Sequence, residues 1–147
     1  MKLIKCPEVF EGYSRSLFIA GGISGCSDWQ NEFVSMFWDK DIVLINPRRD
    51  NYDFDDPSLE EKQISWEFDH LQKSDAVSFW FPNETLCPIT LYELGKISNS
   101  DKKLFIGVDP DYSRKNDVII QTSLIRPDVE VVFSLEKLID QVKEWLK

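Results

Sequence analysis

The chain has 147 residues, with 42% hydrophobic and 29% charged residues, which is the size and composition of one globular domain. Its net charge of −9 argues against a nucleic-acid polymer as partner, because such proteins need a positive surface to release counterions. No apolar run approaches about 18 residues, so we expect no membrane span, and the short apolar N-terminus does not resemble a signal peptide. Three cysteines without a CxxC motif or metal-ligand spacing indicate a reduced, cytoplasmic protein.

The apolar pattern predicts strands and helices that alternate along the chain. In chain order we expect a strand over 15–20, a helix opening after Ser27, a strand over 41–45, a polar loop over 48–57, a helix over 58–73, a strand over 76–81, a helix over 88–99, a strand over 104–108, a polar loop over 109–116, a strand over 129–133 and a helix over 135–146. Continuous apolar strands alternating with helices are typical of a parallel sheet covered on both faces. We therefore predict a single α/β domain over residues 1–147, with a doubly wound, flavodoxin- or Rossmann-like sheet of about five mainly parallel strands. The ligand of such a sheet lies beyond the carboxyl ends of its strands.

The first predicted helix has both a start signal and an apolar face. Ser27 and Gln30 have the spacing of a capping box, in which each side chain bonds the other's backbone. Trp29, Phe33 and Phe37 recur every four residues, so we expect them on one buried stripe.

A glycine-rich loop follows the first strand. Gly21, Gly22 and Gly25 permit a tight turn and a close approach of the backbone to a ligand. Their spacing is neither GxGxxG nor that of a Walker loop, which disfavours a nicotinamide cofactor or ATP. Ser24 and Ser27 are candidates to bind a phosphate or a sugar hydroxyl there. An ordinary strand-to-helix turn is the alternative interpretation.

Glu93 is the carboxylate that the helical pattern singles out. On the helix over 88–99 it lies between Ile89 and Ile97, where a carboxylate is costly unless it has a partner or a purpose. Gly95 in the same helix costs about 1 kcal/mol relative to alanine, so we expect another part of the protein to pack against its backbone. The alternative is a Glu93 side chain that reaches Lys96 at the surface.

Glu67 is the second candidate carboxylate. It shares a helical stripe with Ile64 and Leu71, so we expect it to be buried and functional. Asp69 instead has a lysine four residues on, which is the spacing of a surface ion pair. Two carboxylates that face one crevice, here Glu93 and Glu67, are what the cleavage of a glycosidic bond requires.

Other polar and aromatic residues have less specific patterns. Asp75 precedes the strand over 76–81 and so lies at the opposite end of the sheet, where we interpret it as structural. His70 is the one histidine of the sequence, and no nucleophile elbow accompanies it to form a Ser/His/Asp triad. Five aromatic residues either stack on a base at the site or fill the core: Trp29, Trp66, Trp80, Phe81 and Tyr92.

With these motifs in this order, the chain resembles the nucleoside 2-deoxyribosyltransferase family, in its deoxyribosyltransferase-like branch. The resemblance covers roughly residues 15–108 and rests on residues 18–23, Asp28-Trp29, Asn46-Pro47-Arg48, Trp66-Glu67, Ser74-Asp75-Ala76, residues 79–82 and Tyr92-Glu93-Leu94-Gly95. It implies that Glu93 is the nucleophile, which forms a ribosyl-enzyme ester, and that Glu67 holds the sugar. From the strand ends and the matching motifs, we expect the substrate to be bound by Gly21, Gly22, Ser24, Asp28, Asn46, Arg48, Phe81 and Asn83.

The chain departs from the family pattern just before the predicted nucleophile. Transferases of the family carry an aspartate there, linked with proton transfer at the base, whereas this chain has Leu86-Cys87-Pro88. The family also completes its site with a residue near a neighbour's C-terminus, which implies a homo-oligomer. Asn116 and Gln121 lie in a suitable region for that role. The resemblance implies no cofactor and no metal.

Three functions are compatible with these observations. The leading hypothesis is an enzyme that cleaves the N-glycosidic bond of a (deoxy)nucleoside or nucleotide, by transfer to another base or by hydrolysis. The second is a module that binds or senses a nucleotide-derived small molecule on the same fold. The third is a glycohydrolase of NAD or of nucleotide sugars. In each, the partner is a small molecule and neither a nucleic-acid polymer nor a membrane.

Overall fold

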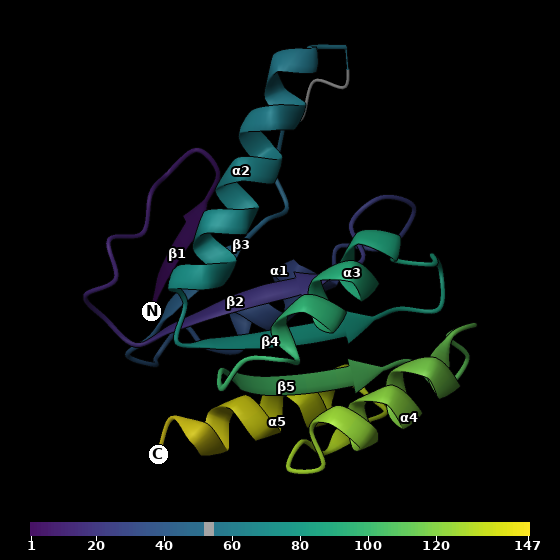
Figure 1. Cartoon of the computed structure of the whole chain (residues 1–147). Helices are drawn as coiled ribbons and strands as arrows, with labels where there is room; N and C mark the ends of the chain where they lie inside the picture. The colour runs from purple at the N-terminus through teal and green to yellow at the C-terminus, as the bar shows by residue number, and fades with distance from the viewer. Residues whose placement is uncertain (52–54) are drawn as a thin grey trace.

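The computed structural model describes residues 1–51 and 55–147, and within them it contains six strands and five helices (Figure 1). The strands are β1 (Lys2–Lys5), β2 (Ser16–Gly21), β3 (Val43–Asn46), β4 (Ala76–Phe81), β5 (Lys103–Val108) and β6 (Val131–Val132). The helices are α1 (Trp29–Ser35), α2 (Pro57–Lys73), α3 (Pro88–Ile97), α4 (Lys115–Ile125) and α5 (Leu135–Trp145). The predicted polar loop over 48–57 includes residues 52–54, which lie outside the described part of the chain.

All strand pairs of the sheet are parallel, in the order β1-β3-β2-β4-β5-β6. From β2 onward this is the flavodoxin-like order 2-1-3-4-5, and the chain reverses direction across the sheet between β2 and β4. The doubly wound α/β prediction is confirmed. The sheet has one strand more than expected, because Lys2–Lys5 pairs with β3 at the edge. That strand is short and only one of its residues, Ile4, is buried, so it lacks the apolar run that marks the central strands.

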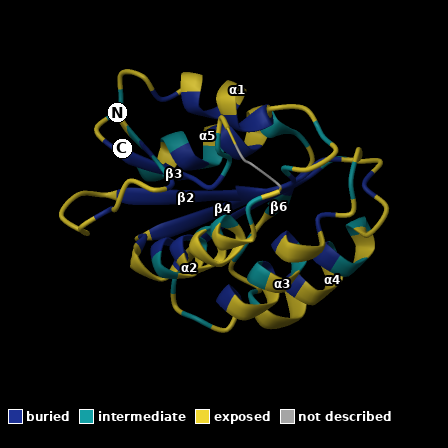
Figure 2. Cartoon of the chain, turned by 90° about the horizontal axis from the view of Figure 1, so that it is seen from above, coloured by how far each residue is buried: buried dark blue, intermediate teal, exposed yellow. Residues whose placement is uncertain are grey.

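Helices cover both faces of the sheet. Figures 1 and 2 show α2, α3 and α4 on one face and α1 and α5 on the other. Alternate residues of each strand face opposite sides, so Phe18 and Val77 pack under α2 and α3 whereas Leu17 and Ala76 pack under α1 and α5. The buried residues of α2, Trp66, His70 and Leu71, all belong to its carboxyl-terminal half. Its amino-terminal half therefore stands clear of the sheet (Figure 1).

Helix α1 begins one residue later than the capping box predicted. Asp28 is the cap, and its carboxylate accepts a hydrogen bond from the Asn31 backbone N–H at 3.1 Å. Ser27 bonds instead to Glu84, and the Gln30 side chain turns inward to the Gly22 carbonyl. The predicted aromatic stripe is confirmed, because Trp29, Phe33 and Phe37 are all buried.

The carboxyl-terminal part of the chain differs most from the sequence expectation. Helix α4 starts at Lys115, inside the predicted loop, and continues through a segment that was not assigned. Only Val118 and Thr122 of this helix are buried, whereas Ile120 and Leu124 are exposed, so its sequence lacks a clear apolar stripe. The predicted strand over 129–133 is reduced to Val131–Val132, which pairs with β5 at the sheet edge.

Candidate active site

Two candidate carboxylates belong to α2 and α3, which lie on the same face of the sheet. Glu93 belongs to α3, which starts at the carboxyl end of β4, and Glu67 belongs to α2. Burial, together with the neighbouring charge of Glu67, raises the pKa of Glu93 from its ordinary 4.5 to about 8, and Lys96 opposes the shift. Burial also raises the pKa of Glu67. The sequence singled out both residues separately, and the fold brings them near enough for the charge of Glu67 to add to the raised pKa of Glu93.

A network of hydrogen bonds holds Glu67 in place. The Gln63 amide, one turn earlier on α2, donates to Glu67 Oε1 at 2.7 Å and to the Pro47 carbonyl after β3 at 2.9 Å. The bond to Glu67 favours its ionised form and so opposes the effect of burial on its pKa. Gln63 Oε1 is itself buried and has no hydrogen-bond partner among the described residues. Sequence reasoning missed Gln63 as a site residue, although its i, i+4 spacing from Glu67 was a usable signal.

The N-terminal segment holds the part of α2 that carries Glu67. Trp66 Nε1 donates to the Glu8 carbonyl at 2.7 Å, and the Phe10 backbone N–H donates to His70 Nε2 at 3.0 Å. His70 Nδ1 lies 2.7 Å from the Trp66 carbonyl, and the two rings are stacked with centroids 4.1 Å apart. His70 therefore has a structural role in orienting α2.

The surroundings of Glu93 differ from the predicted apolar stripe. Ile97 is buried, whereas Ile89 is 64% exposed, so Glu93 lies at the boundary between core and solvent. The expectation for Gly95 was wrong, because a Cβ atom there would meet nothing within 4 Å.

The predicted glycine loop is shaped by contacts within the protein. A Cβ on Gly21 would come within 2.5 Å of the Trp80 carbonyl, and one on Gly22 would lie 2.9 Å from Pro82 Cγ and 3.0 Å from the Cys87 sulfur. Glycine is therefore required at both positions for the loops after β2 and β4 to pack together. These contacts support the structural interpretation of the loop.

The Arg48 side chain bonds to the loop that follows β2. Its guanidinium donates to the Ser27 carbonyl and to Gln30 Oε1, both at 2.9 Å, and to the Cys26 carbonyl at 3.2 Å. Asp28 lies 3.7 Å from Arg48, which makes an ion pair. The buried Asn46 accepts from the Arg48 backbone N–H at 2.9 Å. Three predicted substrate-binding residues, Asp28, Asn46 and Arg48, are therefore brought together, and they bind one another.

The other predicted substrate-binding residues are divided between core and surface. Phe81 is completely buried and packs on Tyr112, with ring centroids 5.3 Å apart, so its ring has no surface to offer a substrate. Ser24 and Asn83 are exposed on the loops after β2 and β4. Among the aromatic residues considered for stacking, Trp29, Trp66 and Trp80 are buried, whereas Tyr92 is 74% exposed.

Two carboxylates have the structural roles expected of them. Asp75 accepts hydrogen bonds from the backbone N–H and the hydroxyl of Ser16, both at 2.8 Å, at the amino end of β2. Asp69 and Lys73 form an ion pair of 2.7 Å on α2.

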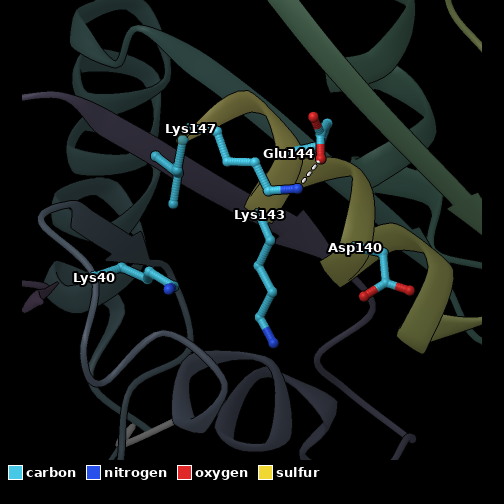
Figure 3. A pocket seen from close by; sticks show the side chains of 6 residues that line it. Lys40, Asp140, Lys143, Glu144 and Lys147 are labelled. Atoms are coloured by element: carbon cyan, nitrogen blue, oxygen red, sulfur yellow. Dashed lines mark hydrogen bonds and ion pairs between the residues drawn. The ribbon is translucent and has the colours of Figure 1, made fainter.

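Two surface hollows lie away from the carboxylate pair. One, of about 400 Å³, is lined by Lys40 and the end of α5, including Lys143 and Lys147 (Figure 3). The other, of about 460 Å³, lies between the ends of α3 and α4, around Ser98 and Arg126. Both are at the amino ends of the strands, whereas ligands of such sheets bind at the carboxyl ends.

The described residues contain no group of three or more side chains suited to hold a metal ion. No helix among them is long and apolar enough to cross a membrane.

The strand order defines a flavodoxin-like α/β protein, in which Glu67 and Glu93 lie on two helices of one face. The family model for nucleoside 2-deoxyribosyltransferase-like proteins matches residues 14–112, which run from β2 through β5 and include Glu67 and Glu93. The chain therefore belongs to this family. The family indicates a transferase-like enzyme with a small-molecule nucleoside as substrate. No curated protein matches the chain.

Proposed function

We propose that the protein cleaves the N-glycosidic bond of a nucleoside or nucleotide, with the Glu93 carboxylate as nucleophile at the anomeric carbon. The pairing of Glu93 with Glu67 carries the proposal, because two neighbouring carboxylates are the machinery that glycosidic cleavage uses. Both residues belong to the segment that matches the family.

Glu93 and Glu67 have different roles in a two-step reaction. Ionised Glu93 attacks C1′ and the base departs, which leaves an ester between enzyme and sugar. Glu67, held by Gln63, binds the sugar hydroxyls and stabilises the positive charge that develops on the sugar ring. Water or a second base then attacks C1′ and releases Glu93, which gives hydrolysis or transfer.

Replacement of the nucleophile tests this proposal directly. Glu93→Ala and Glu93→Gln are expected to lower base release from a panel of nucleosides and nucleotides, followed by chromatography with and without an acceptor base, by at least about 10³-fold. Glu61→Gln, an exposed carboxylate of α2, is the matched control and keeps its activity. Unchanged turnover in both Glu93 variants contradicts the nucleophile assignment.

A binding module on the same fold is the second candidate. The residue that precedes α3 favours this candidate. It is Cys87, which makes no side-chain cap, and burial raises the pKa of its thiol to about 12. A group with so high a pKa does not protonate a leaving base at neutral pH. Calorimetry with nucleotides distinguishes the candidates, since a binding module shows affinity without base release.

We also propose that the protein is a cytoplasmic homo-oligomer. Large apolar side chains are exposed on the helices of one face, namely Ile64, Phe68, Ile89, Tyr92, Ile120 and Leu124. Such a surface is typical of an interface with another chain. The three free cysteines support a reducing compartment. Sedimentation velocity measures the oligomeric state, and a monomer at all concentrations contradicts this proposal.

A further inference from the structure

Gln63 of α2 lies between two hydrogen-bond acceptors. Its Nε2 atom donates to the Pro47 carbonyl at 2.9 Å and to Glu67 Oε1 at 2.7 Å. A carbonyl oxygen can only accept, so the NH2 side of the amide must face Pro47, because the opposite orientation would set two acceptors against each other. The contacts therefore fix the orientation of the Gln63 amide and use both of its N–H groups.

These two bonds tie Glu67 to the sheet. Gln63 and Glu67 are four residues apart on α2, and a pair with that spacing on a helix surface normally interacts only within the helix. Gln63 also reaches off the helix, to the carbonyl of the residue that follows β3. The neighbouring Trp66 is anchored as well, since its Nε1 donates to the Glu8 carbonyl at 2.7 Å. Glu67 is thus held to the carboxyl end of β3, which is the end of the strands where ligands of such sheets bind.

Stability alone does not account for a glutamine at position 63. The Gln63 Oε1 atom is buried and accepts no hydrogen bond from the described residues. A buried acceptor without a donor is unfavourable, and a methionine of similar length would have none. What a methionine would lose is the pair of bonds from Nε2 to Pro47 and Glu67. Residues that break such a packing rule are expected at functional sites.

The bond from Gln63 determines which Glu67 oxygen is left for a ligand. An amide N–H points at Glu67 Oε1, so this oxygen cannot carry the proton of the carboxyl group. Within residues 1–51 and 55–147, Gln63 provides the one hydrogen bond to the Glu67 carboxylate, and the Glu67 side chain is half-buried. We infer that Gln63 is a positioning residue, which ties Glu67 to the carboxyl end of β3 and leaves Glu67 Oε2 to accept a hydroxyl group of the substrate's sugar. The inference rests on the proposed function.

A double-mutant cycle tests the inference. Base release by the full-length protein is measured for Gln63→Met, Glu67→Ala and the double variant, on the best substrate of the nucleoside panel. We expect Gln63→Met to lower kcat/KM about 10-fold, because it removes a hydrogen bond to a charged group. In the Glu67→Ala background the same change is expected to lower kcat/KM by less than about two-fold, since Gln63 acts through Glu67. Gln72→Met, at an exposed position of the same helix, is the matched control and keeps its activity.

A titration of Glu67 provides a test that needs no activity. The carbon-13 resonance of the Glu67 carboxyl is followed against pH in the wild type, in Gln63→Met and in Gln63→Asn, whose amide is too short to reach both acceptors. The bond from Gln63 opposes the effect of burial on the pKa of Glu67, so its loss is expected to move the titration to higher pH in both variants. The charge of Glu67 also acts on Glu93 of α3 and on Cys6 beyond β1. These substitutions leave both groups in place, so the shift reports the lost bond, and Gln72→Met is expected to titrate like the wild type.

The outcomes separate this inference from the proposed function. Losses for Gln63→Met and Glu67→Ala that multiply in the double variant, or an unchanged kcat/KM in Gln63→Met, overturn the inference and leave the proposed function intact. Absence of Glu93-dependent base release from every compound overturns the proposed function. The titration then tests the positioning of Glu67 by itself. A shift to higher pH in both Gln63 variants supports it, and an unchanged titration contradicts it.

Discussion

The Gln63 amide donates to Glu67 Oε1 on α2 at 2.7 Å, and the charge of Glu67 adds to the effect of burial, which is the main cause of the raised pKa of Glu93 on α3. In the proposed mechanism only ionised Glu93 attacks C1′, so the protonation state of Glu93 controls the reaction.

Removal of the Glu67 charge is expected to shift the pH dependence of catalysis. In the wild-type protein we expect kcat/KM to rise with pH toward about 8 as Glu93 ionises. Glu67→Gln removes the neighbouring charge, so the pKa of Glu93 falls and the rising limb moves to lower pH, with a lower plateau because Glu67 binds the sugar. The measurement is a pH profile of base release from one nucleoside substrate, made on both proteins. A rising limb at the same pH in both proteins contradicts the coupling.

Glu93 also makes stability depend on pH. Its pKa is 4.5 in an unfolded chain and about 8 in the folded protein, so the folded protein binds more protons between these values. The stability that Glu93 contributes is therefore complete below about pH 4.5 and is lost as the pH rises through about 8. Glu93→Gln keeps a neutral side chain, and we expect it to exceed the wild type by about 2 to 4 kcal/mol at high pH. Urea denaturation across this pH range measures the difference, with Glu61→Gln as control; equal pH dependence of Glu93→Gln and wild type contradicts it.

Two glycine-to-alanine changes are expected to have opposite effects. Gly95→Ala places its Cβ in open space within α3 and should stabilise the fold by about 0.5 to 1 kcal/mol. Gly21→Ala drives its Cβ into the Trp29 ring and the Trp80 carbonyl, so we expect a loss of about 1 to 3 kcal/mol or more. Thermal denaturation followed by circular dichroism compares them. A destabilised Gly95→Ala variant would show that something packs on α3 in solution, as an oligomer interface does.

Arg48 is expected to act on stability more than on substrate affinity. Arg48→Met removes the donor of the Gln30 amide oxygen and of the Cys26 carbonyl, while the Ser27 carbonyl keeps its bond from the Trp29 backbone N–H, and the loss should cost about 1 to 3 kcal/mol. Arg114→Met is the control, because it removes only an exposed ion pair with Asp117 and should change stability by no more than about 1 kcal/mol. Chemical denaturation gives both values. A stable Arg48→Met variant with reduced phosphate-dependent binding would restore the sequence-based role of Arg48 in the substrate site.

The apolar pattern was enough to predict the central architecture. Strands such as Ala76–Phe81 are buried along their whole length, and continuous burial leaves a continuous apolar run in the sequence. Lys2–Lys5 and α4 escaped prediction because edge elements bury few residues and so carry a weak pattern. Phe81 and Arg48 were predicted to bind substrate because they lie at strand ends. Position at a strand end does not say whether a side chain faces the core, the solvent or a neighbouring loop.

The sequence by itself determined that Glu93 and Glu67 lie on amphipathic helices, each near apolar neighbours, because helical periodicity depends on local spacing alone. The tertiary structure decided that the charge of Glu67 acts on Glu93, since this depends on how α2 and α3 pack on one face of the sheet. It also decided that Gly95 faces open space and that the Arg48 side chain forms hydrogen bonds with the loop after β2. Long-range packing sets these environments, and no local pattern encodes them.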